Sequence, residues 1–387
     1  MPAPRPFRID VPQAALDAIR ARVAAYDWHE MPRGPGLEGS WAYGANLDFM
    51  RALCAYWTDH YDWRKWEAAL NRFPQFKADA NGLDIHFYLE HGSGPSPQPL
   101  ILSHGWPGSV FESLHVIEPL AHPERFGGDT KDAFTVVVPS LPGYGFSGKP
   151  AKPIGPRTVA RHFDALMTDV LKLPDYIAQG GDWGSAISGW MGYEGKGCRA
   201  VHLNMMGWQS PGTAPETDEE KKAAEAARQL FEMEGAYFRE QSTKPQTLSY
   251  AMMDSPVGAC AWIVEKFHTW SDTRKGFERI YTKDQLLTNV MIYLVTRSFN
   301  TATWLYRGLF EDPGGDPIPP KSRVEKPVGI ARFPVDLIPF PPRSQVEKSL
   351  NVVRWTEFDE GGHFAALERP DDLVGDIRAF ARGLNGR

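Results

Sequence analysis

An aspartate stands at the apex of the glycine-flanked stretch Gly180-Gly181-Asp182-Trp183-Gly184. Residues 175–179 before it are typical of a strand, and residues 185–190 after it are typical of a helix. Small residues two positions on either side let a strand-to-helix turn tighten and present its apex. Because a carboxylate is already ionised at neutral pH, Asp182 is predicted to attack a saturated carbon and form an alkyl ester. The motif alone is equally compatible with a helix-capping aspartate.

A second glycine-rich turn, His104-Gly105-Trp106-Pro107-Gly108, directly follows the apolar residues 100–103. In a hydrolase with a nucleophile elbow, this position supplies one oxyanion-hole amide, and the residue after the nucleophile supplies the other. We therefore assign the hole to the backbone N–H groups of Trp106 and Trp183. They would stabilise the charge that develops on the Asp182 carbonyl oxygen when water attacks the ester. His104 itself is interpreted as structural.

The predicted base is His363, in the stretch Gly361-Gly362-His363-Phe364 near the end of the chain. It follows the last expected strand, and the usual chain order is nucleophile, acid and then histidine. Asp336 comes just after the strand expected at 327–333, so it is the predicted acid that orients His363. Asp359 and Glu360 are too close to His363 in the sequence to orient its ring. The other acidic residues lie before that strand: Glu311, Asp312 and Asp316.

The saturated carbon that Asp182 attacks could belong to an epoxide or an alkyl halide. Opening an epoxide also requires an acid that protonates the ring oxygen. A tyrosine phenol stays neutral at pH 7 and can do this. Five tyrosines lie between residues 209 and 320: Tyr237, Tyr250, Tyr281, Tyr293 and Tyr306. Their spacing does not choose among them.

The composition restricts the class of protein. A net charge of -6 over 387 residues, without a dense basic run, argues against a nucleic-acid partner. The three cysteines, Cys54, Cys198 and Cys260, are far apart, which fits reduced thiols better than disulfides or a zinc site. No apolar run approaches the roughly 18 residues that span a bilayer. We expect a cytoplasmic enzyme with neither a metal nor an organic cofactor.

The hydrophobic period changes along the chain. Strand-like runs at 83–89, 100–103 and 134–138, with a helical pattern at 159–171, predict an α/β protein whose mostly parallel sheet carries helices on both faces. The expected parts are a helical and meandering N-terminal segment (1–80), the first part of the core (81–208), a helical lid (209–320) and the second part of the core (321–387).

The chain resembles the microsomal-type epoxide hydrolases, which have the α/β-hydrolase fold with an extra N-terminal segment. The likeness runs nearly end to end. The matching stretches are 62–65, 70–74, 82–87, His104-Gly105-Trp106-Pro107-Gly108-Ser109, Pro142-Gly143-Tyr144-Gly145-Phe146-Ser147, Gly180-Gly181-Asp182-Trp183-Gly184-Ser185, 254–258, 265–267 and Gly361-Gly362-His363-Phe364-Ala365-Ala366.

The resemblance implies a role for individual residues. Asp182 matches the family's nucleophile and His363 its base. Asp336 falls where the family has its acid, which is often a glutamate one methylene longer. Tyr237 and Tyr306 match the two lid tyrosines that hold the epoxide oxygen. The membrane anchor of the mammalian members has no counterpart in this sequence, so membrane association is not implied.

The leading interpretation is an epoxide hydrolase whose partners are a small apolar epoxide and water. A haloalkane dehalogenase also uses an Asp-Trp pair, but it needs N–H donors for the halide where this chain has the two matched tyrosines. A non-catalytic ligand carrier on the same fold is the third interpretation. The sequence leaves a homo-oligomer open.

Overall fold

In the computed structural model of the protein, residues 3–37, 39–207, 213–312 and 319–385 are described. Their centre is a nine-stranded sheet in the order β1-β2-β3-β5-β4-β6-β7-β8-β9. The strands are β1 (Arg5–Phe7), β2 (Gln75–Ala80), β3 (Leu83–Glu90), β4 (Gln98–Ser103), β5 (Phe134–Pro139), β6 (Tyr176–Gly180), β7 (Cys198–Leu203), β8 (Val324–Arg332) and β9 (Leu350–Glu357).

The strands from β5 to β9 pair in parallel, and the three strands at the other edge are antiparallel. The predicted mostly parallel sheet is thus confirmed. All residues of β5 and β6 are buried, as expected for strands with helices on both faces. From β4 the chain crosses first to β5 on one side and then to β6 on the other. Such a switch point opens a crevice at the carboxyl ends of the strands, where ligands bind in α/β folds.

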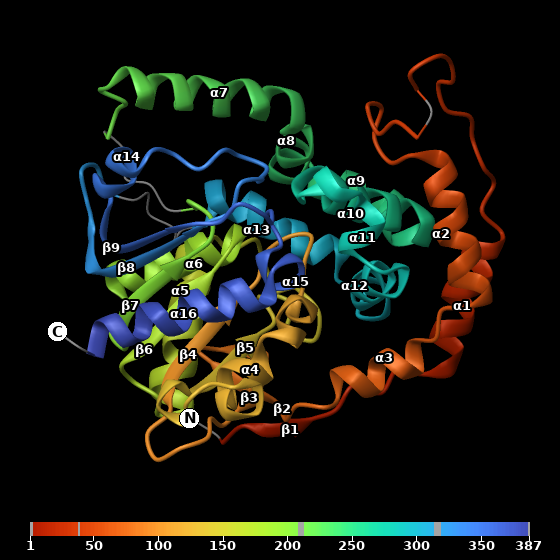
Figure 1. The fold of residues 1–387 in the computed structure, drawn as a ribbon. Coiled ribbons are helices and arrows are strands. Elements are labelled where there is room, and N and C mark those ends of the chain that lie inside the picture. Colours follow the sequence, from red (N-terminus) through yellow and green to blue (C-terminus); the bar gives the residue numbers. More distant parts are fainter. Residues whose placement is uncertain (1–2, 38, 208–212, 313–318, 386–387) are drawn as a thin grey trace.

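Helices cover both faces of the sheet (Figure 1). On one face α4 (Ile117–Ala121) packs with α16 (Pro370–Asn385), and on the other α5 (Pro156–Ala165) packs with α6 (Asp182–Glu194). Two short helices, α14 (Arg343–Glu347) and α15 (Ala365–Glu368), flank β9 and precede α16. The expected helix over 159–171 is split, because α5 ends at Ala165 and a π-helical turn follows over Leu166–Val170.

The N-terminal segment runs from the sheet edge to the lid helices (Figure 1). Its helices are α1 (Gln13–Ala24), α2 (Leu47–Asp59) and α3 (Trp63–Leu70). Within the segment, the Asn71 side chain at the end of α3 accepts from the Ile9 N–H at 2.9 Å and donates to the Ile9 carbonyl at 2.8 Å, which joins its two ends. Sequence patterns indicated mainly helices here, and β1 and β2 were not foreseen. Their strand character comes from pairing at the edge of the sheet, which a three-residue run does not reveal.

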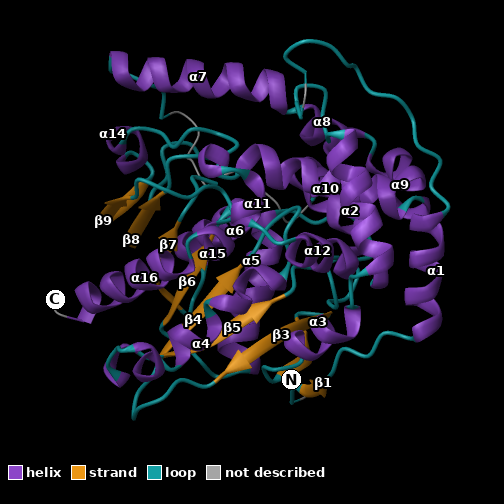
Figure 2. Ribbon diagram, turned by 45° about the vertical axis from the view of Figure 1, so that its right-hand side comes forward, coloured by secondary structure: helices purple, strands orange, loops and turns teal. Residues whose placement is uncertain are grey.

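Between β7 and β8 the described residues form helices and their connections (Figure 2). These helices are α7 (Asp218–Glu234), α8 (Ala236–Thr243), α9 (Pro245–Asp254), α10 (Pro256–Trp270), α11 (Phe277–Ile280), α12 (Lys283–Val295) and α13 (Phe299–Glu311). The predicted start of the lid, position 209, lies outside the described residues, as do positions 313–318 before its predicted end. Among the described helices, none is long and apolar enough to cross a membrane.

Candidate active site

Asp182 lies at a strained turn between β6 and α6. Its φ of 48° is unusual for a residue with a side chain. Glycine is needed on both sides, because a Cβ at Gly180 would lie 2.2 Å from the backbone of Gly184, and one at Gly184 would lie 1.9 Å from the Ser103 carbonyl oxygen. The residue at the N-cap of α6 is Gly181, so Asp182 does not cap the helix. Its carboxylate is free to point toward the crevice above β4 and β6.

The Asp182 carboxylate is held by the turn after β4. The Trp106 N–H donates to Asp182 Oδ1 at 2.7 Å. Gly105 permits this approach, because a Cβ there would lie 2.0 Å from Oδ1. Trp183, the other predicted oxyanion-hole residue, follows Asp182 in the first turn of α6. Among the described residues, the Trp183 N–H makes no hydrogen bond to the Asp182 carboxylate. Oδ2 of that carboxylate faces His363.

His363 connects two carboxylates. Its Nδ1 lies 2.6 Å from Asp336 Oδ1, and its Nε2 lies 3.4 Å from Asp182 Oδ2. The aspartate therefore reaches the imidazole despite being one methylene shorter than glutamate. The His363 backbone N–H donates to the Trp270 carbonyl at 3.0 Å, which anchors the loop after β9. The structure thus joins three residues that are far apart in the sequence.

The charge state of His363 follows from these contacts. Burial opposes the charged form, but the Asp336 and Asp182 carboxylates favour it and hold the pKa of His363 well above its ordinary value. The two carboxylates therefore favour the imidazolium form of His363. His104 differs, since burial lowers its pKa to about 4. Its Nε2 accepts from the Leu141 N–H at 3.2 Å, in agreement with the structural role expected for it.

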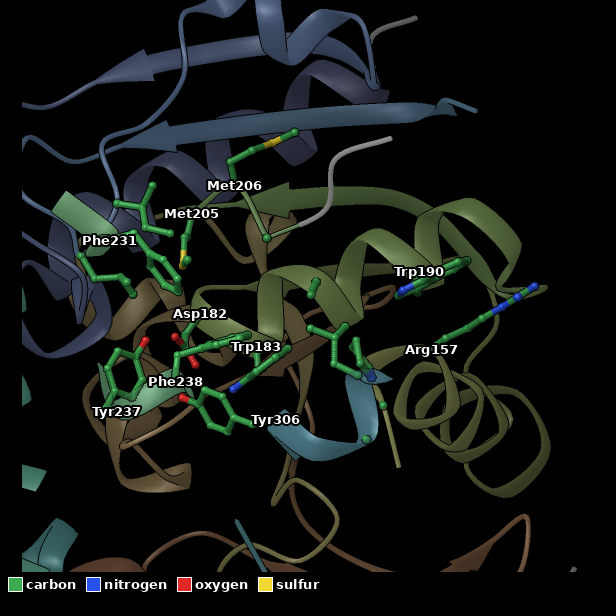
Figure 3. Close-up of a pocket in the computed structure, with 18 residues that line it drawn as sticks. Arg157, Asp182, Trp183, Trp190, Met205, Met206, Phe231, Tyr237, Phe238 and Tyr306 are labelled. Atoms are coloured by element: carbon green, nitrogen blue, oxygen red, sulfur yellow. The ribbon is translucent and has the colours of Figure 1, made fainter. Parts of the chain in front are cut away.

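The structure distinguishes the five lid tyrosines. Tyr237 of α8 and Tyr306 of α13 are buried and line one cavity with Asp182, and their phenol oxygens point toward its carboxylate (Figure 3). Burial raises the pKa of both phenols well above the ordinary value, so both remain protonated and can donate. The other three have different surroundings: Tyr250 is exposed, Tyr281 bonds Ser271, and Tyr293 donates to the Gly108 carbonyl.

Aromatic contacts fix the two phenols. The Tyr237 ring stacks on Trp106, with 5.3 Å between centroids, and Tyr306 meets Trp183 edge to face at 4.8 Å. Trp106 follows Gly105 in the turn after β4, and Trp183 follows Asp182 at the start of α6, so the lid helices α8 and α13 pack directly on the two turns. The phenols can therefore hold a substrate oxygen at a defined position above Asp182.

The cavity has a volume of about 440 Å³. It extends from Asp182 along α6 toward Trp190 (Figure 3). Away from the phenols its lining is largely apolar and includes Met205, Met206, Phe231, Phe238 and Leu337. This shape suits an apolar molecule with one polar reacting end.

Sequence reasoning missed two half-buried glutamates near His363. Burial raises the pKa of Glu112 to about 8 and that of Glu368 to about 7. Glu368 accepts from the Phe364 N–H at 3.0 Å and the Asp272 N–H at 2.9 Å, so it holds the loop that carries His363. Neither glutamate belongs to a local motif, and only the fold brings them close to the site.

Known proteins resemble this chain over nearly its whole length. The family model described as the epoxide hydrolase N terminus matches residues 4–113, and that of the alpha/beta hydrolase fold matches residues 98–258. A putative epoxide hydrolase of Stigmatella aurantiaca is 37% identical over 99% of this chain and 86% of its own. Epoxide hydrolase 1 of Sus scrofa is 32% identical over 97% of this chain and 88% of its own.

The chain belongs to the epoxide hydrolase family. Its structure agrees with that assignment: the Aspergillus niger epoxide hydrolase superimposes with a TM-score of 0.85 at 33% identity, covering 99% of this chain and 97% of that one. Epoxide hydrolases are hydrolases that act on ether bonds. The predicted resemblance and fold are therefore confirmed.

The described part of this family member holds no group of three or more His, Cys, Asp or Glu side chains placed to bind a metal ion. Its three cysteines are buried free thiols.

Proposed function

We propose that this epoxide hydrolase converts an apolar epoxide and water into a vicinal diol through an alkyl ester on Asp182. One observation carries the proposal. The Asp182 carboxylate has one oxygen bound to the Trp106 N–H and the other facing His363, and it lies where Tyr237 and Tyr306 converge in an apolar cavity. These groups can supply the nucleophile, the base and the acid that the reaction requires.

In the first half-reaction, Asp182 Oδ2 attacks an epoxide carbon and the C–O bond of the ring breaks. Oδ1 stays on the Trp106 N–H and becomes the ester carbonyl oxygen. One phenol, Tyr237 or Tyr306, gives its proton to the departing ring oxygen, and the other stabilises the phenolate. The product of this step is a hydroxyalkyl ester.

In the second half-reaction, water attacks the ester carbon of Asp182 while His363 takes its proton. Esterification removes the negative charge that faces His363 Nε2, so the pKa of His363 falls. The imidazolium then gives its proton to the phenolate, which restores the phenol, and the neutral imidazole can act as a base. The oxyanion forms at Oδ1, held by the N–H groups of Trp106 and Trp183. As the intermediate collapses, His363 returns the proton to the diol oxygen, and the acid proton left on Asp182 passes to His363 and restores the imidazolium.

The haloalkane dehalogenase alternative has less support. Two phenol oxygens face the carboxylate, and phenols suit an oxygen leaving group that must gain a proton. A ligand carrier would not need the contacts of His363 with both Asp182 and Asp336, so that alternative is disfavoured. The largely apolar cavity favours an epoxide with an apolar body, and a relative from Bombyx mori is named a juvenile hormone epoxide hydrolase.

Oxygen-18 water tests the covalent route. With enzyme in excess over styrene oxide, the first diol should carry unlabelled oxygen from Asp182, and repeated turnover should place label in the peptide that contains Asp182. The Asp182→Asn variant should fold and lose turnover, whereas Asp169→Asn, an exposed carboxylate, serves as the control. A first diol whose new oxygen comes wholly from water would refute the ester.

A further inference from the structure

Two separate cavities meet at Asp182. The apolar cavity lies on the lid side. A second cavity, of about 30 Å³, lies on the other side and is lined by Asp182, His363 and residues 104–106 of the turn after β4. Among the described residues, Asp182 alone lines both cavities. The nucleophile is therefore the partition between them.

The second cavity is more polar than the first. Its polar side chains come from several elements: Ser103, His104, Glu112, Ser113, Gln179, Asn204 and His363. The Ser103 hydroxyl is buried and has no hydrogen-bond partner among the described residues. A buried hydroxyl without a partner is costly, and a water molecule commonly satisfies such a group. The volume exceeds the roughly 10–15 Å³ that one water requires, but it is far too small for a substrate.

We propose that this cavity holds the hydrolytic water and that Glu112 is the residue that positions it. The inference rests on the proposed ester mechanism. Once Asp182 is alkylated, the alkyl group fills the apolar cavity on the lid side and obstructs water there. The opposite face of the ester carbon borders the polar cavity, which His363 also lines. Water in that cavity meets the base and the ester carbon together.

Glu112 has the location and the chemistry for this task. It lies in the short 3-10 helix Val110–His115, and its carboxyl packs on Gly108, where a Cβ would lie 1.4 Å from Oε1. Burial raises the pKa of Glu112 to about 8, so the group is neutral at pH 7. A neutral carboxyl can donate one hydrogen bond to water and accept another. It does not compete with His363 for the proton.

The test separates the two chemical steps. Stopped-flow tryptophan fluorescence with styrene oxide follows ester formation and ester hydrolysis as distinct phases, because Trp106 and Trp183 flank the nucleophile. In Glu112→Leu, ester formation should stay within about twofold and hydrolysis should slow by about 10- to 100-fold, so that the ester accumulates. Glu112→Gln, which can still donate and accept, should recover most of the hydrolysis rate. Glu118→Leu, a half-buried carboxyl on neighbouring α4, should change neither phase.

A second variant covers the case in which Glu112→Leu does not fold. Ser103→Val removes the unpartnered hydroxyl and narrows the cavity while keeping a strand-forming residue in β4. It should also slow hydrolysis selectively. Unchanged hydrolysis in the folded variants, or an equal loss in both phases, would overturn the role of Glu112 and its cavity. Absence of any ester phase in the wild type would instead refute the proposed function itself.

Discussion

The Nε2 atom of His363 lies 3.4 Å from Oδ2 of Asp182, on the carboxylate oxygen that does not bind the Trp106 N–H. In the proposed mechanism these residues are the base and the nucleophile, and they lie within ion-pairing distance before substrate arrives. In that mechanism the pairing stabilises the imidazolium until Asp182 is esterified, and it links the timing of base activation to the first chemical step.

The pH dependence of ester hydrolysis should reveal this link. The Asp336 and Asp182 carboxylates raise the pKa of His363 in the free enzyme, and esterification removes the contribution of Asp182. The hydrolysis rate should rise with pH to a plateau, with a midpoint below the imidazole pKa of the free enzyme. Single-turnover kinetics between about pH 5 and 9 and NMR titration of His363 give the two values. Equal midpoints would contradict the mechanism.

Replacing either buried phenol should slow ester formation. Tyr237→Phe and Tyr306→Phe each remove a donor to the ring oxygen, and the alkylation rate should fall by about 10²- to 10⁴-fold in the absence of that acid. Ester hydrolysis should change little, because the phenols face the lid-side cavity. Tyr250→Phe is the control, since Tyr250 is exposed. Loss of both steps together would indicate a structural role.

Asp336→Asn should accumulate the ester. The substitution removes the charge that lies 2.6 Å from His363 Nδ1 and that orients the ring. Hydrolysis should fall by up to about 10⁴-fold, as for the comparable aspartate of serine hydrolases, while Asp182 still reacts with the epoxide. Mass spectrometry of the enzyme during turnover detects the adduct. Asp359→Asn changes an exposed carboxylate near the same loop and should behave as the wild type.

Glu112→Gln should alter the pH dependence of stability. Because the folded-state pKa of Glu112 is raised to about 8, its contribution is fully present below the unfolded value of about 4.5 and is lost as pH rises through 8. The variant lacks this titration, so its melting temperature should fall less than that of the wild type between pH 5 and about 8.5. Parallel melting curves across this range would exclude a buried neutral carboxyl.

Alanine substitutions at two glycines should have opposite effects. Gly184→Ala places a Cβ 1.9 Å from the Ser103 carbonyl oxygen, and the overpacking should lower the free energy of unfolding by about 1–3 kcal/mol and disturb the elbow. Gly375→Ala, in α16, meets nothing within 4 Å and should raise it by about 0.5–1 kcal/mol. Chemical denaturation measures both. A neutral Gly184→Ala would show that the elbow is less tight than described.

Local patterns in the sequence were sufficient for the elbow, the turn that carries Trp106 and the loop that carries His363. Each is a short run of residues, and its glycines and the strand before it indicate a tight turn at that position. The buried apolar strands likewise predicted the parallel sheet. The resemblance to a family then implied Tyr237 and Tyr306, which spacing alone did not distinguish from the other lid tyrosines.

The tertiary structure decided how distant groups meet. Tyr237 and Tyr306 come from two helices, and their position over Asp182 depends on how those helices pack on Trp106 and Trp183. Glu112 has no local signal, because its neutral state and its place behind the nucleophile arise only when other elements bury it. The edge strands β1 and β2 also depend on their pairing partners. Near neighbours in the chain determine the conformation of a turn, but burial, charge state and cavities are properties of packing between segments.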